Sequence, residues 1–289
     1  MKYGFIVTGG EAREQVALAR AAEEAGWDGV FTWDGVHVSD DIETYDPWAL
    51  MGAMAMATER VRLGAILTPP SRRRPWNLAR QATTVDRLSG GRLILPVGLG
   101  AADDRGVASL GEEADRKTRA ERMDEALEIV IGLWSGDPFG YQGKHYQFEP
   151  MAFRPTPLQR PRIPIWVVGA WPSERSMSRV LRYDGLLPYW LPQRGTEGLA
   201  RPQEPEQLAE MRDWIGARRS HEGFDIVMEG TTSADDAGAA ADAVRTWADA
   251  GATWWIESDW SNWDVAVMRR RIEAGPPRGE ALAGIGADG

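Results

Sequence analysis

The chain contains no cysteine, only three histidines and no long apolar run, and each absence excludes a class of protein. Without cysteine there can be no disulfides, thiolate zinc sites, iron–sulfur clusters or cysteine nucleophiles. A metal site of three histidines would need all of them in one place. The longest uncharged apolar stretches, residues 93–102 and 163–172, are about ten residues long and too short to span a bilayer. We therefore expect no metal centre and no membrane association.

Positive charge is also in deficit. The chain has 33 Lys and Arg against 43 Asp and Glu, which gives a formal net charge of −10. A nucleic-acid-binding domain needs a basic face, so this balance argues against a nucleic-acid partner. Residues 1–7 lack the longer apolar core and cleavage site of a signal peptide. The sequence predicts a cytoplasmic protein.

Short apolar runs alternate with longer helical runs along almost the whole chain. Eight runs are typical of β-strands, and they start near residues 3, 29, 61, 92, 163, 185, 224 and 253. Eight strand–helix units predict a closed (β/α)₈ TIM barrel of the α/β class, and the alternative is an open doubly wound sheet. We expect one domain over residues 1–289, with an insertion between strands four and five at about 101–162 and a flexible tail at about 275–289.

In such a barrel, functional side chains gather after the C-terminal ends of the strands. Glycines, hydroxyls, indoles and a few acids occupy these positions: Thr8, Trp33, Asp34, His37, Thr68, Gly98, Gly100, Gly169, Ala170, Trp171, Ser173, Trp190, Glu257 and Trp260. An imidazole exchanges protons near neutral pH, so His37 is the candidate catalytic histidine. Asp34 is interpreted as orienting His37 or holding a ligand hydroxyl, although it could equally cap its loop.

Several of these positions would suit an anion. Gly98 and Gly100 allow a backbone to approach a ligand closely, and Ser173 at a helix start can bind phosphate together with the helix N-terminus. Residues 230–232 follow the seventh strand, where many barrels hold a phosphate. Residues 72–74, three arginines, could meet an anionic cofactor tail. The competing interpretations are ordinary turns, a simple N-cap and a solvated loop.

The acids after the last strands leave a different chemistry open. Glu257 and Asp259 follow the eighth strand, and Glu229 ends the seventh. A pair of carboxylates can perform the acid–base work of a glycosidase. A barrel lyase or hydrolase is therefore one function that the sequence leaves open.

Tryptophan is overrepresented, with 14 residues against 6 Phe and 6 Tyr. Four of them, Trp33, Trp171, Trp190 and Trp260, follow predicted strands. An indole buries a large area, stacks on flat rings and keeps one N–H donor. We interpret these four as the wall of an aromatic pocket, and the alternative is plain packing at the barrel rim.

Several segments carry a resemblance to a known family. They are residues 21–31, 57–64, 80–95, 133–136, 143–146 and 161–169, and the most specific part is Leu88-Ser89-Gly90-Gly91-Arg92. Over about residues 1–190 the chain resembles the bacterial-luciferase-like superfamily of flavin- or deazaflavin-dependent oxidoreductases. Members use reduced FMN with oxygen, or the deazaflavin coenzyme F420 for hydride transfer, bound across the strand C-termini.

The resemblance implies roles for the positions already named. The cofactor ring would contact Thr8, Trp33, Thr68, Gly98 and Gly100, with Asp34 and His37 beside it, and an unusual cis peptide is expected near Thr68. The phosphate end would meet Gly169, Ala170 and Ser173. The substrate pocket would take Trp171, Trp190, Trp260 and Glu257.

The chain departs from the luciferases at two points. Leu99 stands where they carry a basic residue for the phosphate, and the histidine expected directly after the acid of strand two is displaced to His37. FMN is expected as the commoner cofactor, with F420 as the alternative. The resemblance thus predicts an oxidoreductase or monooxygenase that acts on a small organic substrate as a homodimer. A separate reductase that supplies the reduced cofactor is a further expected partner. The alternative within this family is a flavin-binding protein without turnover.

Overall fold

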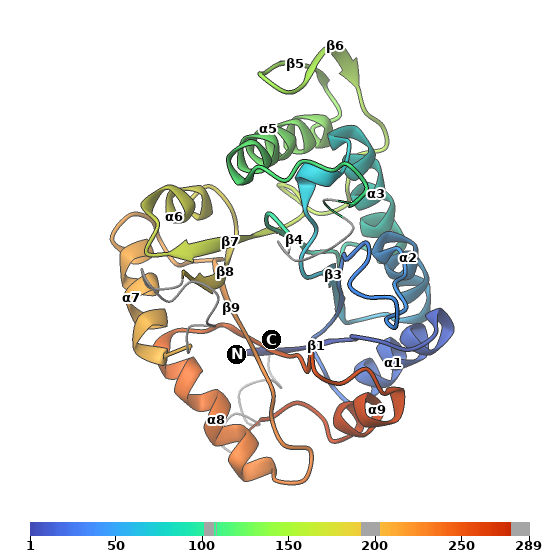
Figure 1. Cartoon of the computed structure of the whole chain (residues 1–289), viewed down its shortest axis with the longest axis vertical. Helices are drawn as coiled ribbons and strands as arrows, with labels where there is room; N and C mark the ends of the chain where they lie inside the picture. The colour runs from blue at the N-terminus through green and yellow to red at the C-terminus, as the bar shows by residue number, and fades with distance from the viewer. Residues whose placement is uncertain (101–106, 108, 192–202, 279–289) are drawn as a thin grey trace.

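Eight parallel strands form a nearly closed barrel (Figure 1) in the computed structural model, which describes residues 1–100, 107, 109–191 and 203–278. The strands are β1 (Lys2–Ile6), β2 (Gly29–Thr32), β3 (Arg62–Ala65), β4 (Leu95–Val97), β7 (Ile165–Trp171), β8 (Gly185–Trp190), β9 (Asp225–Gly230) and β10 (Trp254–Glu257). Their order is β3-β2-β1-β10-β9-β8-β7-β4. The predicted TIM barrel is confirmed.

The barrel closes between β3 and β4 through two isolated bridges. Leu63 pairs with Leu93, and Thr68 pairs with Val97. Between the two bridges the Ile66–Leu67 peptide is cis, near the place that the resemblance implied. We call this junction of β3 and β4 the seam. It lacks a regular ladder of hydrogen bonds, and it includes Thr68, a predicted cofactor contact.

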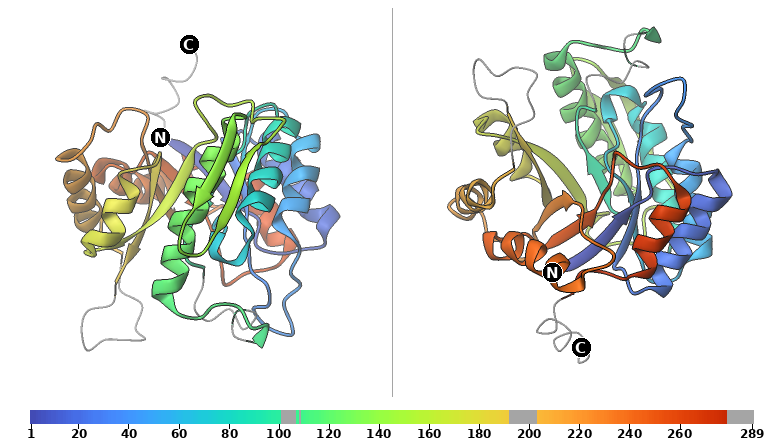
Figure 2. Two further views of the ribbon diagram at one scale, coloured as in Figure 1. Left: turned by 90° about the horizontal axis from the view of Figure 1, so that it is seen from above. Right: turned by 60° about the horizontal axis from the view of Figure 1, so that its bottom comes forward.

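Helices cover the outside of the barrel, as the two views of Figure 2 show. They are α1 (Ala12–Glu24), α2 (Pro47–Ala57), α3 (Pro75–Leu88), α5 (Arg116–Trp134), α6 (Glu174–Val180), α7 (Pro205–Gly216), α8 (Ala237–Ala250) and α9 (Val265–Glu273), with a 3₁₀ turn η1 (Pro70–Arg72) before α3. Asp46 caps α2 by accepting a hydrogen bond from the Ala49 N–H at 2.9 Å. No helix in these described ranges combines the length and apolar composition needed to cross a bilayer.

The insertion contains a hairpin that projects beyond the barrel beside α5 (Figure 1). Its strands β5 (Pro138–Gln142) and β6 (Gln147–Ala152) pair in antiparallel fashion. Trp76 of α3 contacts Tyr146 and Phe148 edge-on, with ring centroids 6.3 Å apart in both pairs. The tail expected at 275–289 is described only as far as Arg278, whose guanidinium bonds the Asp28 carboxylate at 3.1 Å.

Three aromatic rings fill the inside of the barrel. Phe31, Trp166 and Trp254 contact one another with ring centroids 5.3–6.0 Å apart. All three side chains are almost completely buried, in an interior cluster separate from the core between barrel and helices. Glycines on the neighbouring strands make room for them. A Cβ on Gly185 would lie 2.4 Å from Cδ1 of Trp166, and one on Gly4 would lie 2.7 Å from the Phe31 ring.

We predict that Gly185→Ala lowers the free energy of unfolding by about 1–3 kcal/mol, because the added methyl group overpacks the Trp166 ring. The matched control is Gly238→Ala in the first turn of α8, where a Cβ meets only Oδ1 of Asp236, at 3.4 Å. This control should leave stability unchanged or raise it by up to about 1 kcal/mol. Urea denaturation measures both, and equal effects of the two substitutions would contradict the packing argument.

Candidate functional site

The C-terminal ends of the barrel strands form an aromatic mouth. Trp33, directly after β2, donates its indole N–H to the Thr8 carbonyl at 2.8 Å. Its ring meets Trp260 and Trp263 edge-on, with centroids 6.4 and 5.5 Å apart. The structure thus brings Thr8, Trp33 and Trp260 together, as the sequence suggested. Trp263 lies in the same loop after β10 as Trp260, and it was missed because it is further from the end of the strand.

The other two predicted wall residues lie elsewhere. Trp190 is 6% exposed and belongs to the core between barrel and helices, and Trp171 packs against the same core. Side chains alternate along a strand, so the neighbouring Tyr189 takes the interior side of β8 and is 49% exposed. The four indoles therefore do not form one wall, and Tyr189 is a mouth residue that the search for tryptophans missed.

Asp34 and His37 do not contact each other in the expected way. Asp34 is held by two arginines: Arg73 donates Nε and Nη2 to its carboxylate at 2.9–3.0 Å, and Arg72 donates at 3.2 Å. The Asp34 side chain is only 4% exposed. His37 instead pairs with Asp40 at 3.1 Å, where both side chains are well exposed. Asp34 therefore joins the loop after β2 to the loop after β3.

This clamp also explains two of the three arginines at 72–74. Burial raises the pKa of Asp34, while the guanidinium groups of Arg73 and Arg72 act against that shift. Because both arginines bind a protein carboxylate, the structure does not support the suggested contact with a cofactor tail. The interpretation of the run as a plain solvated loop is wrong for Arg72 and Arg73, which are largely buried, and it holds for Arg74, which is exposed.

The seam between β3 and β4 provides an open polar position. The hydroxyl of Thr68 is fully buried and has no hydrogen-bond partner among the described residues. Beside it, a Cβ on Gly98 would lie 2.8 Å from both Leu67 and Val168. The side chains of Leu67 and Val168 fill the space beside Gly98, so only glycine fits there. The unpartnered Thr68 hydroxyl is the group at this seam that suits a polar atom of a ligand.

A basic group does reach the end of β4, although Leu99 is not basic. The guanidinium of Arg119, from α5, bonds the carbonyls of Leu99 and Gly100. Gly100 has a φ of +82°, a left-handed conformation that favours glycine. Sequence reasoning missed Arg119 because it lies on a helix, 20 residues after Leu99, and no local pattern relates the two.

The predicted phosphate end, after β7, is largely occupied by its own hydrogen bonds. Ser173 caps α6 by accepting from the Ser176 N–H, and the Ser176 hydroxyl in turn accepts from the Ala170 N–H at 2.9 Å. A Cβ on Gly169 would lie 2.4 Å from Leu186 and 2.8 Å from the Met177 sulfur. Gly169 thus serves packing against α6. A phosphate contact by these residues stays a prediction.

Glu257 bonds to the turn at residues 230–232, where the sequence suggested a phosphate site. Its carboxylate accepts from the Thr232 N–H at 2.6 Å, the Thr232 hydroxyl at 2.7 Å and the Trp255 indole at 3.2 Å. Arg271 pairs with it at 3.3 Å. The side chain faces α9, away from the mouth, and lines a cavity of about 230 Å³ with Thr8, Asp259 and Arg271. It is therefore separated from the tryptophans with which it was grouped.

Glu229 differs from the other acids. It ends β9 on the side of Val227, which belongs to the interior cluster, so its carboxyl faces the mouth. Trp260 donates its indole N–H to Oε2 at 3.4 Å. Burial raises the pKa of Glu229, and the hydrogen bonds from Trp260 and Ser258 act weakly against it. It keeps its proton to a higher pH than an ordinary glutamate does.

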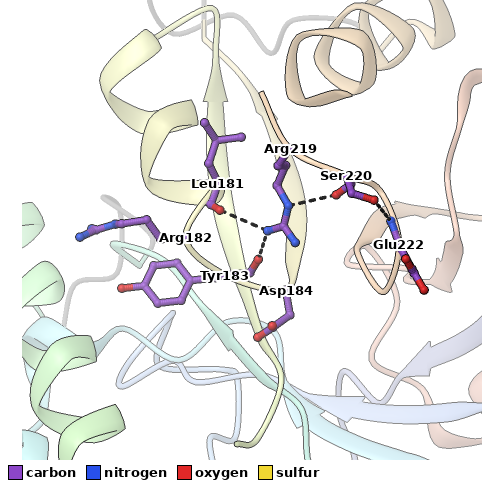
Figure 3. Close-up of a pocket in the computed structure, with 7 residues that line it drawn as sticks. All are labelled: Leu181, Arg182, Tyr183, Asp184, Arg219, Ser220 and Glu222. Atoms are coloured by element: carbon purple, nitrogen blue, oxygen red, sulfur yellow. Dashed lines mark hydrogen bonds between the residues drawn. The ribbon is translucent and has the colours of Figure 1, made fainter. Parts of the chain in front are cut away.

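A larger hollow of about 500 Å³ lies at the opposite end of the barrel, between α6 and the loop before β9 (Figure 3). Arg219 crosses it and donates to the carbonyls of Leu181, Tyr183 and Ser220. These bonds satisfy carbonyls that the end of α6 leaves open. The hollow is therefore explained by structural capping.

We predict that Asp34→Asn lowers the free energy of unfolding by about 3–5 kcal/mol, because two largely buried guanidinium groups lose the carboxylate that they share. Asp40→Asn is the control, since that side chain is 86% exposed. Its effect should stay below about 0.5 kcal/mol. Thermal and urea unfolding test both variants, and an Asp34→Asn protein of wild-type stability would show that the clamp is not structural.

Comparison with known proteins adds a family match. A family model described as luciferase-like monooxygenase matches residues 3–287. An F420-dependent glucose-6-phosphate dehydrogenase of Amycolatopsis mediterranei is 32% identical over 163 residues, which cover 55% of this chain and 48% of that protein. An uncharacterized protein of Mycobacterium tuberculosis is 30% identical over 201 residues, 63% of this chain and 70% of the other. The chain thus spans about half the length of the dehydrogenase.

Solved structures show the same fold. An F420-dependent secondary alcohol dehydrogenase, in complex with an F420–acetone adduct, superposes with a TM-score of 0.75 at 17% identity, covering 96% of this chain and 98% of that one. A monooxygenase from Streptomyces bottropensis gives 0.70 at 20% identity, covering 95% and 98%. At these identities the likeness concerns the barrel and its strand order alone.

Proposed function

The chain belongs to the luciferase-like monooxygenase family, and on that premise we propose that it is an oxidoreductase that uses the deazaflavin coenzyme F420 to oxidise or reduce a small organic substrate. The observation that carries the proposal is the barrel mouth. It combines a buried hydroxyl, that of Thr68, which has no partner among the described residues, with the indoles of Trp33, Trp260 and Trp263. The curated relative named as F420-dependent supports this cofactor over FMN.

The cofactor supplies the hydride chemistry, and the protein provides the environment. Thr68 would offer its hydroxyl to a polar atom of the cofactor. Trp33 and Trp260 would shield the mouth from water, and low polarity there would strengthen electrostatic interactions. This division of labour is usual for cofactor enzymes, in which the protein binds, orients and shields.

The mouth favours an uncharged substrate. Glu257 already occupies the turn after β9 where a substrate phosphate would bind, and Arg271 already has an anionic partner. The described part of the mouth carries the indoles of Trp33, Trp260 and Trp263 and the exposed ring of Tyr189. These features support a small alcohol or ketone rather than a sugar phosphate. The loops expected to select the substrate, near 101–116 and 191–205, fall largely outside the described residues.

FMN remains the second candidate, because monooxygenases share this barrel. An FMN enzyme of this kind would need a separate reductase to supply the reduced cofactor. An F420 enzyme would transfer hydride between the cofactor and its substrate without such a partner. A flavin-binding protein without turnover would bind either cofactor and leave it unchanged. A barrel lyase or hydrolase using Glu257 loses support, because that carboxylate is fully bonded within the protein.

We predict that F420 quenches the tryptophan fluorescence with a dissociation constant below about 100 μM, equivalent to roughly −5.5 kcal/mol. Thr68→Val should weaken binding about tenfold, because the isosteric side chain lacks the hydroxyl that we propose bonds the cofactor. Thr246→Val, on the exposed part of α8, is the control and should bind normally. Tighter binding of FMN than of F420 would reverse the cofactor assignment, and binding of neither would refute the proposed function.

The outer face of α2 supports the proposed homodimer. Every residue of α2 is apolar or glycine, yet Ala49, Ala53 and Met56 are exposed, Met56 to 71%. Leu88 of α3 lies beside this face and is 44% exposed. A helix that is apolar all round is normally covered on every side. We propose that a second copy covers it.

Met56→Glu should therefore convert the dimer into a monomer, because the interface would bury an unpaired carboxylate. Met151→Glu, on the projecting hairpin, is the matched control because Met151 is also exposed. Sedimentation velocity at micromolar concentration distinguishes the two. A wild-type protein that sediments as a monomer would contradict the proposal.

A further inference from the structure

We propose that Glu229 exchanges a proton with the reacting oxygen of the substrate. The inference rests on the proposed oxidoreductase function and deepens it. It is carried by the position of this carboxyl, which faces the barrel mouth from β9 and contacts the indole of Trp260. The function proposed above requires such a group, because hydride transfer between a carbonyl and an alcohol also moves one proton on oxygen.

The position follows from strand register. Glu229 pairs with Ile256 of β10, and both Ile256 and Val227 belong to the cluster inside the barrel. The flanking residues Ile226 and Met228 face the helices. The Glu229 side chain therefore stands above the aromatic filling of the barrel, on the same side of the sheet as Trp33.

The acids of the neighbouring loops are paired with arginines, whereas Glu229 bonds to uncharged donors. Asp34 binds Arg72 and Arg73, and Glu257 binds Arg271 on the other side of the sheet. In the described part of the chain, no lysine or arginine pairs with Glu229. The remaining titratable groups on adjacent elements are Tyr189 of β8 and Asp259, whose Oδ1 accepts from Ser261. Neither supplies a cation.

The carboxyl can still bond a ligand. Its two oxygens offer about four acceptor positions, and its described partners are two donors, the Trp260 indole at 3.4 Å from Oε2 and the Ser258 hydroxyl. Burial without a counter-ion favours the neutral acid, so the carboxyl can donate as well as accept. A neutral carboxylic acid in a nonpolar site is a recognised proton donor in enzymes.

The step balances with the cofactor as the co-reactant. In the reducing direction, the substrate carbon gains hydride from the reduced cofactor, the C=O π bond breaks, and the oxygen takes the proton from Glu229. In the oxidising direction, the Glu229 carboxylate takes the hydroxyl proton as the C–H electron pair leaves to the oxidised cofactor. The carboxyl returns to its starting state through solvent at the mouth.

The first test needs no cofactor. An unfolded glutamate ionises near 4.5, and the folded carboxyl ionises at higher pH. Wild-type stability therefore falls as pH rises from 4.5 through the folded pKa, relative to a variant that cannot ionise. Glu229→Gln should raise the melting temperature more at pH 8 than at pH 4. Asp259→Asn, the control acid at the rim, should show no such increase. An equal effect of Glu229→Gln at both pH values would overturn the proposal.

The second test separates this proposal from the proposed function. Glu229→Gln should bind F420 with wild-type affinity but lose at least about 100-fold in kcat, the usual contribution of a general acid. The pH limb that belongs to Glu229 should disappear from its kcat/KM profile. Failure of the wild type to bind either cofactor would refute the function itself. Normal binding, turnover and pH profile in Glu229→Gln would refute the role of Glu229 alone.

Discussion

The packing of three aromatic rings inside the barrel is the constraint on which the rest of this structure depends. Phe31, Trp166 and Trp254 fill the interior, so the barrel is solid below its mouth. The neighbouring strands must therefore carry small residues beside these rings, because Gly4 and Gly185 have no room for a Cβ. Chemistry is thereby confined to the C-terminal end, where the strands open and the rings stop.

Above this filling, arginines decide which acids are available for chemistry. The guanidinium groups of Arg72, Arg73 and Arg271 neutralise Asp34 and Glu257, and these pairs hold neighbouring loops together. In the described part of the chain, Glu229 bonds only to an indole and a hydroxyl. The difference lies in the partners, because Asp34 and Glu257 bond to guanidinium groups, whereas Glu229 has no such cation beside it and desolvation raises its pKa. Asp34 and Glu257 therefore have structural roles, and Glu229 has the proposed chemical role.

The most specific sequence motif proved to be structural. Arg92, from the Leu-Ser-Gly-Gly-Arg segment, donates to carbonyls of Ala55, Thr58 and Val61, and thus joins the end of α2 to the start of β3. Asp86, just before it, accepts from Leu158 and Gln159 at the end of the insertion. The motif identifies the family because it holds the frame of the barrel, and it contributes nothing to the mouth.

Local patterns were sufficient for the fold. Strands and helices follow from the periodicity of apolar residues, a short-range property, so all eight strands, the hairpin and the caps at Asp46 and Ser173 were predictable. The start of the fourth strand was placed at 92 instead of Leu95, because Leu93 pairs with Leu63 only through an isolated bridge.

The site was predictable in part. Its general place and the grouping of Thr8, Trp33 and Trp260 followed from the order of strand ends. Which side of the sheet each side chain faces, and which partner neutralises it, required the tertiary structure. Trp190 and Glu257 face the helices, while Tyr189 and Glu229, one residue or one strand away, face the mouth. The physical reason is that a strand reverses its side-chain direction at every residue, and the register and partners come from segments distant in the sequence.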